Sequence, residues 1–117
     1  MKKIIPKQNE IWLVEFEPQI GTEIMKTRPA VVLTNNALER LSTRIIVPIR
    51  DFKPNHDLVS YFISIKPTKL NNLVKESTID CSQIKSFDIS RFKKKIGEIN
   101  DDLFQDIISS INICIDK

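Results

Sequence analysis

The sequence predicts a small, mainly β (α+β) fold of short antiparallel strands followed by a C-terminal amphipathic helix. Short apolar segments with partial two-residue alternation recur between turn-rich segments, which is typical of a chain of β-strands. Residues 100–115 instead place their apolar side chains at helical spacing. The length of 117 residues and the hydrophobic content of 41% suit one core. We therefore expect a single domain over residues 1–117.

The first strand is expected over residues 11–17. Ile11, Leu13 and Phe16 alternate imperfectly with more mixed positions, which predicts one well-buried face. Pairing should stop at Pro18, because proline has no N–H for the sheet ladder. The chain contains only two glycines, so we expect Gly21 to give the following loop a conformation that other residues avoid.

The second strand is expected over residues 30–34, directly after an Arg-Pro pair. Pro29 has a fixed φ and biases Arg28 toward an extended conformation. The Arg28 guanidinium should therefore be presented at the mouth of the strand. For an arbitrary protein, the simplest interpretation of this arginine is a surface charge paired with Glu23 or Glu17.

Two further elements follow the second strand. Asn36 and Glu39 have the spacing of a capping box, which predicts a short helix over residues 36–41. Residues 44–49 are nearly continuous in apolar character and predict a central strand covered on both faces, weakened near its end by Pro48.

The chain up to residue 99 then alternates between turn-rich and strand-like segments. Gly97 is expected at a β-bulge or at a close approach of two backbones. The segments are a loop over 51–59, a strand over 60–65, a turn over 67–72, a strand over 77–84, a helical turn or tight bend over 86–92 and a strand over 93–99.

The C-terminal segment predicts a helix that Asn100 can cap, with Asp101 and Asp102 near the positive end of the helix dipole. One face is apolar and should pack against the core or a second subunit. The opposite face is polar and lacks basic side chains, which argues against a membrane-binding helix. The apolar face consists of Leu103, Phe104, Ile107, Ile108, Ile111 and Ile115.

Composition excludes several classes of protein. The net charge of +3 is compatible with an RNA ligand without requiring one. No apolar run approaches the roughly 20 residues needed to span a bilayer, and the start of the chain lacks the apolar region of a signal peptide. We therefore expect a cytoplasmic protein that does not associate with membranes.

The cysteines and the single histidine do not have the spacing of metal ligands, so no metal site and no cofactor are expected. Cys81, inside a predicted strand, and Cys114, on the apolar side of the predicted helix, should be reduced core thiols. His56 lies in a polar stretch and is expected to be solvated. Catalysis by a pair of histidines is excluded by the count.

Two blocks of sequence resemble the MazF/PemK/Kid toxin family. The first is GTEI at residues 21–24 followed by KTRPAVVL at residues 26–33. The second is DCSQIKS at residues 80–86, followed by RF at 91–92 and KIGEI at 95–99. This resemblance covers almost the whole chain. It implies a partly open antiparallel β-barrel with a short helix after its second or third strand, and a metal-independent endoribonuclease that cleaves single-stranded RNA. It also implies a homodimer and a cognate antitoxin with an acidic, disordered tail.

The resemblance also implies roles for individual residues. The arginine that matches Arg28 is the main catalytic group of the family, and the glutamate that matches Glu23 is needed for activity. After the third strand the family usually places a threonine or serine against the scissile phosphate, and this chain has Arg50 there. Contacts to RNA are expected from Thr22, Lys26, Thr27, Asn35, Gln83 and Lys85.

Without a metal, the ribose 2′-OH must attack its own adjacent phosphate. A guanidinium stays protonated and matches two phosphate oxygens, so Arg28 suits the stabilisation of the dianionic phosphorane. Glu23 is the best candidate base, although a carboxylate close to a guanidinium is a weak one.

Arg50 leaves three alternatives open. It is a second phosphate donor beside Arg28, or it fills the site and abolishes cleavage, or it forms a surface ion pair with Asp51 or Asp57. The sequence does not choose between them.

Other functional interpretations also remain open. Trp12 and Phe52 can stack on an unpaired base, although large side chains in a small barrel are more often core residues. The basic run 93–95 can steer RNA or protect an exposed strand edge. A non-catalytic binder with the same fold is the second class of function, and it would bind RNA, an antitoxin or, like CcdB, gyrase. A plain interaction domain is the third class.

Overall fold

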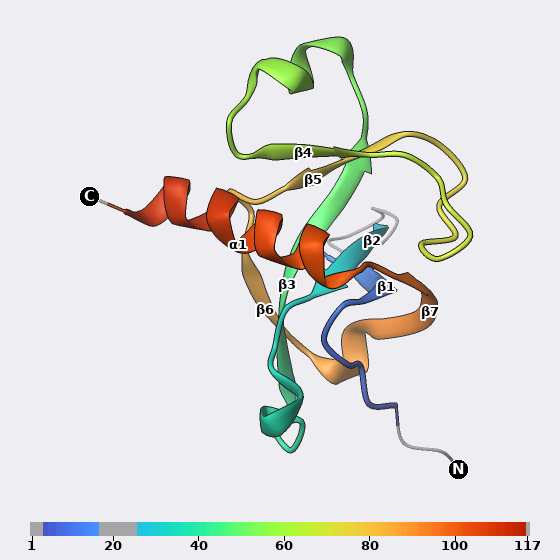
Figure 1. Ribbon diagram of the computed structural model, residues 1–117. Helices are drawn as coiled ribbons and strands as arrows, with labels where there is room; N and C mark the ends of the chain where they lie inside the picture. The colour runs from blue at the N-terminus through green and yellow to red at the C-terminus, as the bar shows by residue number, and fades with distance from the viewer. Residues whose placement is uncertain (1–3, 17–25, 117) are drawn as a thin grey trace, which may run out of the picture.

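The computed structural model describes residues 4–16 and 26–116, and in these ranges it contains seven β-strands, three 3₁₀ turns and one α-helix (Figure 1). The strands are β1 (Glu10–Glu15), β2 (Thr27–Val32), β3 (Thr43–Asp51), β4 (Phe62–Ile65), β5 (Ser77–Asp80), β6 (Lys85–Asp88) and β7 (Phe92–Glu98). The 3₁₀ turns are η1 (Asn36–Leu38), η2 (Pro54–Leu58) and η3 (Ile89–Arg91), and the helix α1 is Asp101–Ile115.

The strands form an antiparallel sheet in the order β4-β5-β3-β2-β1-β7, with β6 also paired to β3. β3 is the central strand because it has two successive partners on one side. Its residues 43–46 pair with β6, and its residues 49–51 pair with β5. Within the described ranges the order of paired strands ends at β4 and β7. The prediction of a mainly β, partly open antiparallel fold is confirmed.

Two hydrophobic clusters pack against the sheet, and β1 contributes to both. Ile11 belongs to the cluster that α1 covers, whereas Trp12 and Val14 belong to the second cluster. Leu13 and Phe16 are only half-buried. The predicted buried face of Ile11, Leu13 and Phe16 is therefore wrong, because this strand is covered on both sides. The core interpretation of Trp12 is confirmed.

The helix α1 lies across one face of the sheet and projects beyond it at its C-terminal end (Figure 1). Asn100 Oδ1 accepts the Leu103 N–H at 2.9 Å, so the predicted cap is confirmed. Ile107 and Ile111 are buried, but Ile115 is 69% exposed and was wrongly assigned to the packed face. No helix in the described part of the chain is long and apolar enough to cross a membrane.

Gly97 lies at a close approach of two backbones, as predicted. A Cβ atom at this position would lie 2.3 Å from the main-chain oxygen of Asn71. Gly97 pairs with Ile11, and the next pair joins Trp12 to Lys95, so the register shifts at this point as in a bulge. The turn over residues 66–72 therefore packs directly on β7.

η1 is shorter than the helix predicted over residues 36–41, and its cap differs. Asn35 Oδ1 accepts the Ala37 N–H at 2.9 Å. Asn36 Oδ1 instead accepts the Gln8 N–H at 2.9 Å. The predicted capping box is wrong, because a long-range hydrogen bond engages the Asn36 side chain.

Two strand predictions and one helical-turn prediction need correction. The strand predicted over 77–84 ends at Asp80, because residues 81–84 turn the chain from β5 into β6. The helical turn predicted over 86–92 is confirmed only for η3, because the residues before it pair with β3. The expectation that β3 is covered on both faces is wrong at Ile45, which is 43% exposed.

His56 is buried, so the prediction of a solvated loop residue is wrong. Its Nδ1 lies 2.7 Å from Thr78 Oγ1 and accepts the Lys53 N–H at 3.2 Å. The His56 ring also packs in T-shaped geometry against the rings of Phe52 and Phe62. η2 thus folds its histidine onto β4 and β5, which local polarity does not reveal.

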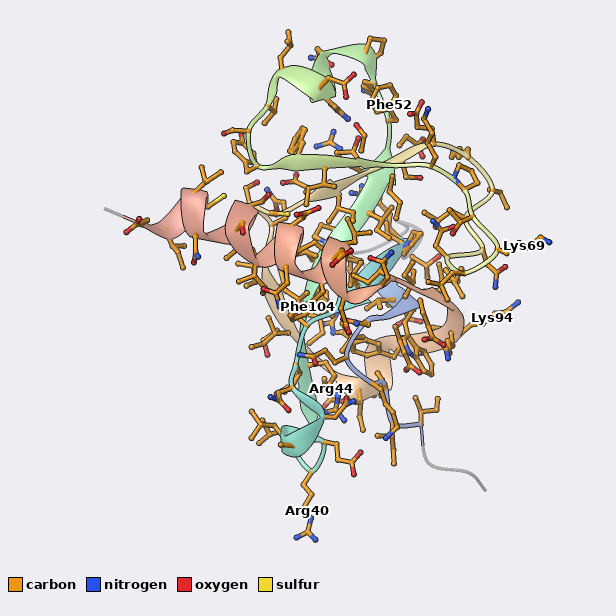
Figure 2. All side chains as sticks on the ribbon, viewed as in Figure 1. Arg40, Arg44, Phe52, Lys69, Lys94 and Phe104 are labelled. Atoms are coloured by element: carbon orange, nitrogen blue, oxygen red, sulfur yellow. The ribbon has the colours of Figure 1, made fainter. Side chains whose placement is uncertain are left out.

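Among the residues that the structure describes, Arg44 has the largest fully buried side chain, with 1% of its surface exposed (Figure 2). Its guanidinium donates to the main-chain oxygens of Pro6 (2.9 Å), Glu39 (2.9 Å), Leu41 (2.7 Å) and Thr43 (2.8 Å). The charge therefore ties the connection between β2 and β3 to the N-terminal segment.

The two cysteines are both free but differ in accessibility. Cys81 is fully buried, and burial raises the pKa of its thiol to about 12. Cys114 is exposed, so its assignment to the core is wrong. Cys81 lies one residue beyond β5 rather than inside a strand.

We expect a maleimide at pH 7.5 to label the native protein once, at Cys114, and the unfolded protein twice. A thiolate is the reactive species, and a buried thiol with a raised pKa supplies almost none. Intact-mass measurement checks the count. Native Cys114→Ser is the control and should remain unlabelled, and rapid labelling of this variant at Cys81 would contradict the burial.

Candidate active site

The sheet register places Arg28 and Arg50 opposite one another. The last pair between β2 and β3 joins Ala30 to Pro48. Continuing this antiparallel register by two residues brings Arg28 of β2 opposite Arg50 of β3, on the same face as Ala30 and Pro48. Both arginines are exposed, so the predicted presentation of Arg28 at the end of its strand is supported by its position.

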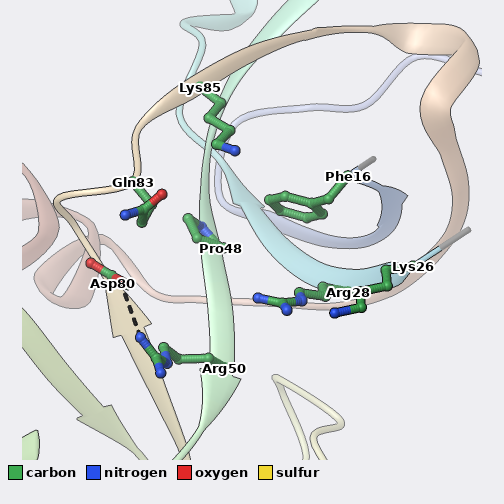
Figure 3. Close-up of a pocket in the computed structure, with 8 residues that line it drawn as sticks. All are labelled: Phe16, Lys26, Arg28, Pro48, Arg50, Asp80, Gln83 and Lys85. Carbon is green, nitrogen blue, oxygen red and sulfur yellow. Dashed lines mark ion pairs between the residues drawn. The ribbon is translucent and has the colours of Figure 1, made fainter. Parts of the chain in front are cut away.

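These arginines lie at a cleft of about 260 Å³, whose lining residues are drawn in Figure 3. The Arg28 side chain extends from β2 toward β3 across this cleft (Figure 3). Of the described residues, four basic side chains and one acidic one line it, and their charge favours an anionic ligand. The lining residues are Phe16, Lys26, Arg28, Pro48, Arg50, Asp80, Gln83 and Lys85.

The cleft forms where β3 changes partner. Ile46 is the last residue of β3 that pairs with β6, and Ile49 is the first that pairs with β5. Pro48 lies between these two pairs, at an interruption of the ladder on that side. Because β5 and β6 separate here, the turn over 81–84 leaves a hollow in front of Pro48.

Arg50 pairs with Asp80 and not with Asp51 or Asp57. Arg50 Nη1 lies 3.6 Å from Asp80 Oδ2, with the Arg50 side chain 40% exposed and that of Asp80 5% exposed. The Arg50 Cζ atom also lies 5.7 Å from the centroid of the Phe62 ring, within range of a cation–π contact. The surface ion pair that was considered for Arg50 is therefore replaced by a pair with a buried acid.

Gln83 and Lys85 reach the cleft from the β5–β6 connection. The Gln83 N–H donates to the Asp80 main-chain oxygen at 3.3 Å, which closes the turn. Lys85 Nζ lies 5.9 Å from the centroid of the Phe16 ring on the opposite wall. An aromatic face and two polar side chains therefore surround the inner end of the cleft.

A second hollow of about 360 Å³ lies on the other side of the arginine pair. Arg28 and Arg50 line both hollows, and Thr27 and Lys53 line the second. Asp51 is also present there, and a hydrogen bond from Lys75, 2.9 Å away, lowers the pKa of Asp51. The ion pair of Asp51 is thus with Lys75, and the nearby charge of Arg28 lowers the pKa of Asp51 further. A ligand with several phosphates that crossed the Arg28–Arg50 pair would have space in both hollows.

The structure brings together most of the predicted site residues that it describes. Arg28, Arg50, Lys26, Gln83 and Lys85 line the first cleft, and Thr27 lines the second hollow. Asn35 does not line either one, because its side chain caps η1. The predictions for Glu23 and Thr22, and those for Pro18 and Gly21, lie outside the described residues.

Sequence reasoning missed Asp80 as a residue of the site and did not foresee Phe16 in its wall. The signal for Asp80 was weak: an acidic residue at the end of a strand ordinarily faces solvent. Phe52 packs against the His56 ring and does not line the first cleft, so the structure does not support its role as a stacking platform.

The basic run 93–95 lies on β7, at one end of the sheet. Lys93 pairs with Glu15 at 3.1 Å, and Lys95 pairs with Glu10 at 3.1 Å and with Glu98 at 3.0 Å. Two of the three lysines thus have acidic partners, which favours protection of the strand edge over capture of RNA.

Comparisons with known proteins agree with this fold. Residues 7–115 match the family model of PemK-like, MazF-like toxins of type II toxin-antitoxin systems. The endoribonuclease MazF of Staphylococcus saprophyticus is 25% identical over 109 residues, which cover 93% of this chain and 90% of that protein.

Solved structures of MazF proteins have the same fold. MazF from Deinococcus radiodurans superposes with a TM-score of 0.76 at 18% identity, covering 98% of this chain and 100% of that one. A MazE-MazF structure from the same organism gives a TM-score of 0.75 at 17% identity, with coverage of 95% and 96%. The chain belongs to the family of PemK-like, MazF-like toxins of type II toxin-antitoxin systems.

Proposed function

We propose that this protein is an endoribonuclease toxin that cleaves single-stranded RNA, including mRNA, at selected sequences and without a metal ion. The observation that supports the proposal is that Arg28 and Arg50 line the same cleft together with two lysines. The family and the endoribonuclease name of the staphylococcal relative support the same activity.

In the proposed reaction the 2′-oxygen forms a bond to phosphorus while the bond from phosphorus to the 5′-oxygen breaks. The products are a 2′,3′-cyclic phosphate and a free 5′-hydroxyl. One proton leaves the 2′-OH and one is added to the departing 5′-oxygen. Arg28 binds two oxygens of the phosphate and strengthens this contact as the phosphorane becomes dianionic.

The cleft also offers contacts that fix the RNA around the reacting phosphate. Lys26 and Lys85 can each bind a phosphate as point charges, and Gln83 can read the edge of a base. Phe16 offers a ring face for an unstacked base. Thr27 lines the hollow beyond the arginine pair, where the chain of the substrate would continue. Thr22 is proposed as a further contact by resemblance alone.

Glu23 is the proposed base, by resemblance to the family. We expect Glu23→Gln to lower the turnover number about 100-fold, because the amide cannot accept the 2′-OH proton. Single-turnover cleavage of a labelled oligonucleotide measures this effect. Glu39→Gln is the matched control, because Glu39 is exposed and pairs with Lys7 outside the cleft. Wild-type turnover in Glu23→Gln would assign the proton to another acceptor.

We also propose a homodimer, and a cognate antitoxin whose acidic segment covers the basic cleft. The four basic side chains of the cleft suit such a segment, and the family is defined by toxin-antitoxin pairs. The structure of MazE-MazF from D. radiodurans is an example of such a pair. A toxin that acts on mRNA would work in the cytoplasm, and residues 1–117 would form its one domain.

The test of the activity is cleavage of single-stranded RNA by the purified protein in excess EDTA. We expect fragments that carry a 2′,3′-cyclic phosphate, detected by mass spectrometry. Complete absence of cleavage with every RNA of a randomised pool would reject the proposal.

A non-catalytic binder of RNA, antitoxin or gyrase is the second candidate, and one observation favours it. Arg50 occupies the position where the family usually has a hydroxyl, and its guanidinium is paired with Asp80. Arg50→Thr and Arg50→Ala separate the two candidates in the same EDTA assay. Lower cleavage in both variants supports a phosphate clamp, and cleavage gained only on substitution supports a binder that Arg50 obstructs.

A further inference from the structure

We propose that Asp80 is a positioning residue for RNA cleavage, because its buried carboxylate holds the Arg50 guanidinium at the cleft opposite Arg28. This inference rests on the proposed nuclease function. It assigns a role to an acid that lies inside an otherwise basic cleft.

Asp80 is a buried residue in the wall of the cleft and not a charge on the protein surface. Only 3% of the residue is exposed, and a carboxylate in such a place requires partners. Its Oδ1 atom accepts two hydrogen bonds from Ser82, from the N–H at 3.1 Å and from the hydroxyl at 2.6 Å. Its Oδ2 atom faces Arg50 Nη1 at 3.6 Å. The carboxylate cannot turn toward solvent without breaking the contacts to Ser82.

Two residues of the paired strands β4 and β5 contact the Arg50 side chain. Asp80 and Phe62 are cross-strand partners in the β4–β5 ladder, and Arg50 pairs with Thr78, two residues before Asp80 on β5. The guanidinium therefore contacts both members of this cross-strand pair: Nη1 lies 3.6 Å from the Asp80 carboxylate, and Cζ lies 5.7 Å from the centroid of the Phe62 ring. These contacts restrict a long side chain that otherwise has many rotamers.

The restricted guanidinium still has donors for a substrate. The Arg50 side chain is 40% exposed, and its contact to Asp80 is longer than a hydrogen bond. A phosphate that binds between Arg28 and Arg50 can therefore approach the Arg50 guanidinium as a second donor group that is already oriented. Orientation before binding lowers the barrier of the chemical step more than it raises affinity.

The two oxygens of Asp80 have separate tasks, which makes the role testable. Oδ1 holds the Ser82 end of the turn that brings Gln83 to the cleft, and Oδ2 faces Arg50. Asp80→Asn can keep an amide oxygen toward Ser82 but removes the charge that attracts Arg50. Asp57→Asn makes the same substitution at an exposed acid that accepts a hydrogen bond from Ser64 and does not line the cleft, so it is the matched control.

The experiment measures kcat and KM of the full chain on one labelled RNA oligonucleotide in EDTA. We expect Asp80→Asn to lower kcat roughly 10- to 100-fold, because Arg50 loses its orientation. KM should stay the same or fall, since the cleft loses a negative charge. Asp80→Glu, which keeps the charge on a longer side chain, should recover part of the loss, and Asp57→Asn should stay within about twofold of wild type.

A double-mutant cycle distinguishes positioning from a general loss of structure. In an Arg50→Ala background, Asp80→Asn should cause no further fall in kcat, because no guanidinium remains to be held. Additive losses, or an unchanged kcat in Asp80→Asn, would overturn the inference while leaving the nuclease function intact. An inactive wild type would instead reject the proposed function, and the inference with it.

Folding of each variant is followed by circular dichroism. If Asp80→Asn does not fold, Asp80→Glu decides the question, because it keeps the buried charge and displaces only its position. A kcat equal to that of the wild type in a folded Asp80→Glu would then count against positioning, and a reduced kcat with unchanged KM would support it.

Discussion

Replacing Arg28 with alanine should reduce RNA cleavage about 100-fold or more, because one preorganised donor to a developing oxyanion is worth about 3 kcal/mol. Arg28 is exposed, and it lies at the end of the β2–β3 ladder beside the cleft. Its loss should therefore leave the thermal unfolding of the protein almost unchanged. The measurement is kcat/KM on a single-stranded oligonucleotide, with the melting temperature as a check of folding.

Two variants sharpen this experiment. Arg28→Lys keeps the charge but loses the bidentate fork, so we expect it to recover only a small part of the activity. Arg40→Ala removes the same charge from the exposed tip of the connection between β2 and β3, away from the cleft (Figure 2). This control should remain close to wild type. Equal losses in Arg28→Ala and Arg40→Ala would mean that net charge, and not the fork, carries the effect.

Replacing Arg44 with methionine should destabilise the fold by about 3 kcal/mol or more. Arg44 is 1% exposed, and its guanidinium donates to four main-chain oxygens. Methionine fills a similar volume but leaves these acceptors without a donor, and each unsatisfied buried group costs about 1 to 3 kcal/mol. Denaturation in guanidinium chloride, analysed as a free energy of unfolding, measures the change.

Arg44→Lys is the intermediate variant, because an ammonium has three donors and cannot reach all four oxygens at once. Arg40→Met is the matched control, since it makes the same substitution on an exposed side chain of the same connection. An Arg44→Met protein as stable as Arg40→Met would show that water satisfies these carbonyls and that the buried charge is dispensable.

Residues near β2 show what local sequence rules predict well. The proline after Arg28 and the apolar run that follows are strong signals, and β2 begins one residue before Arg28. The cap of α1 at Asn100 was predicted for the same reason, because a side-chain oxygen that accepts from an N–H three residues away needs no tertiary contact.

Burial of polar residues was the main failure. His56 was predicted to be solvated and is buried, because a distant strand supplies its partner Thr78. Arg44, whose burial was not predicted from the sequence, is buried for the same reason, since Pro6 of the N-terminal segment accepts one of its hydrogen bonds. Ile115 and Cys114 fail in the opposite direction, since the helix extends beyond the sheet that its pattern was expected to cover. A pattern states which residues can be buried, and the position of the neighbouring elements decides which of them are.

The sequence by itself determined the mainly β class, the C-terminal helix, the family and the presentation of Arg28, because each depends on local backbone preferences or on a matched motif. Only the tertiary structure decided that Arg50 faces Arg28 and is held by Asp80. Those relations depend on strand register and on the place where β3 leaves β6 for β5. Register arises from packing of the whole sheet, so residues far apart in the chain become neighbours that no local pattern identifies.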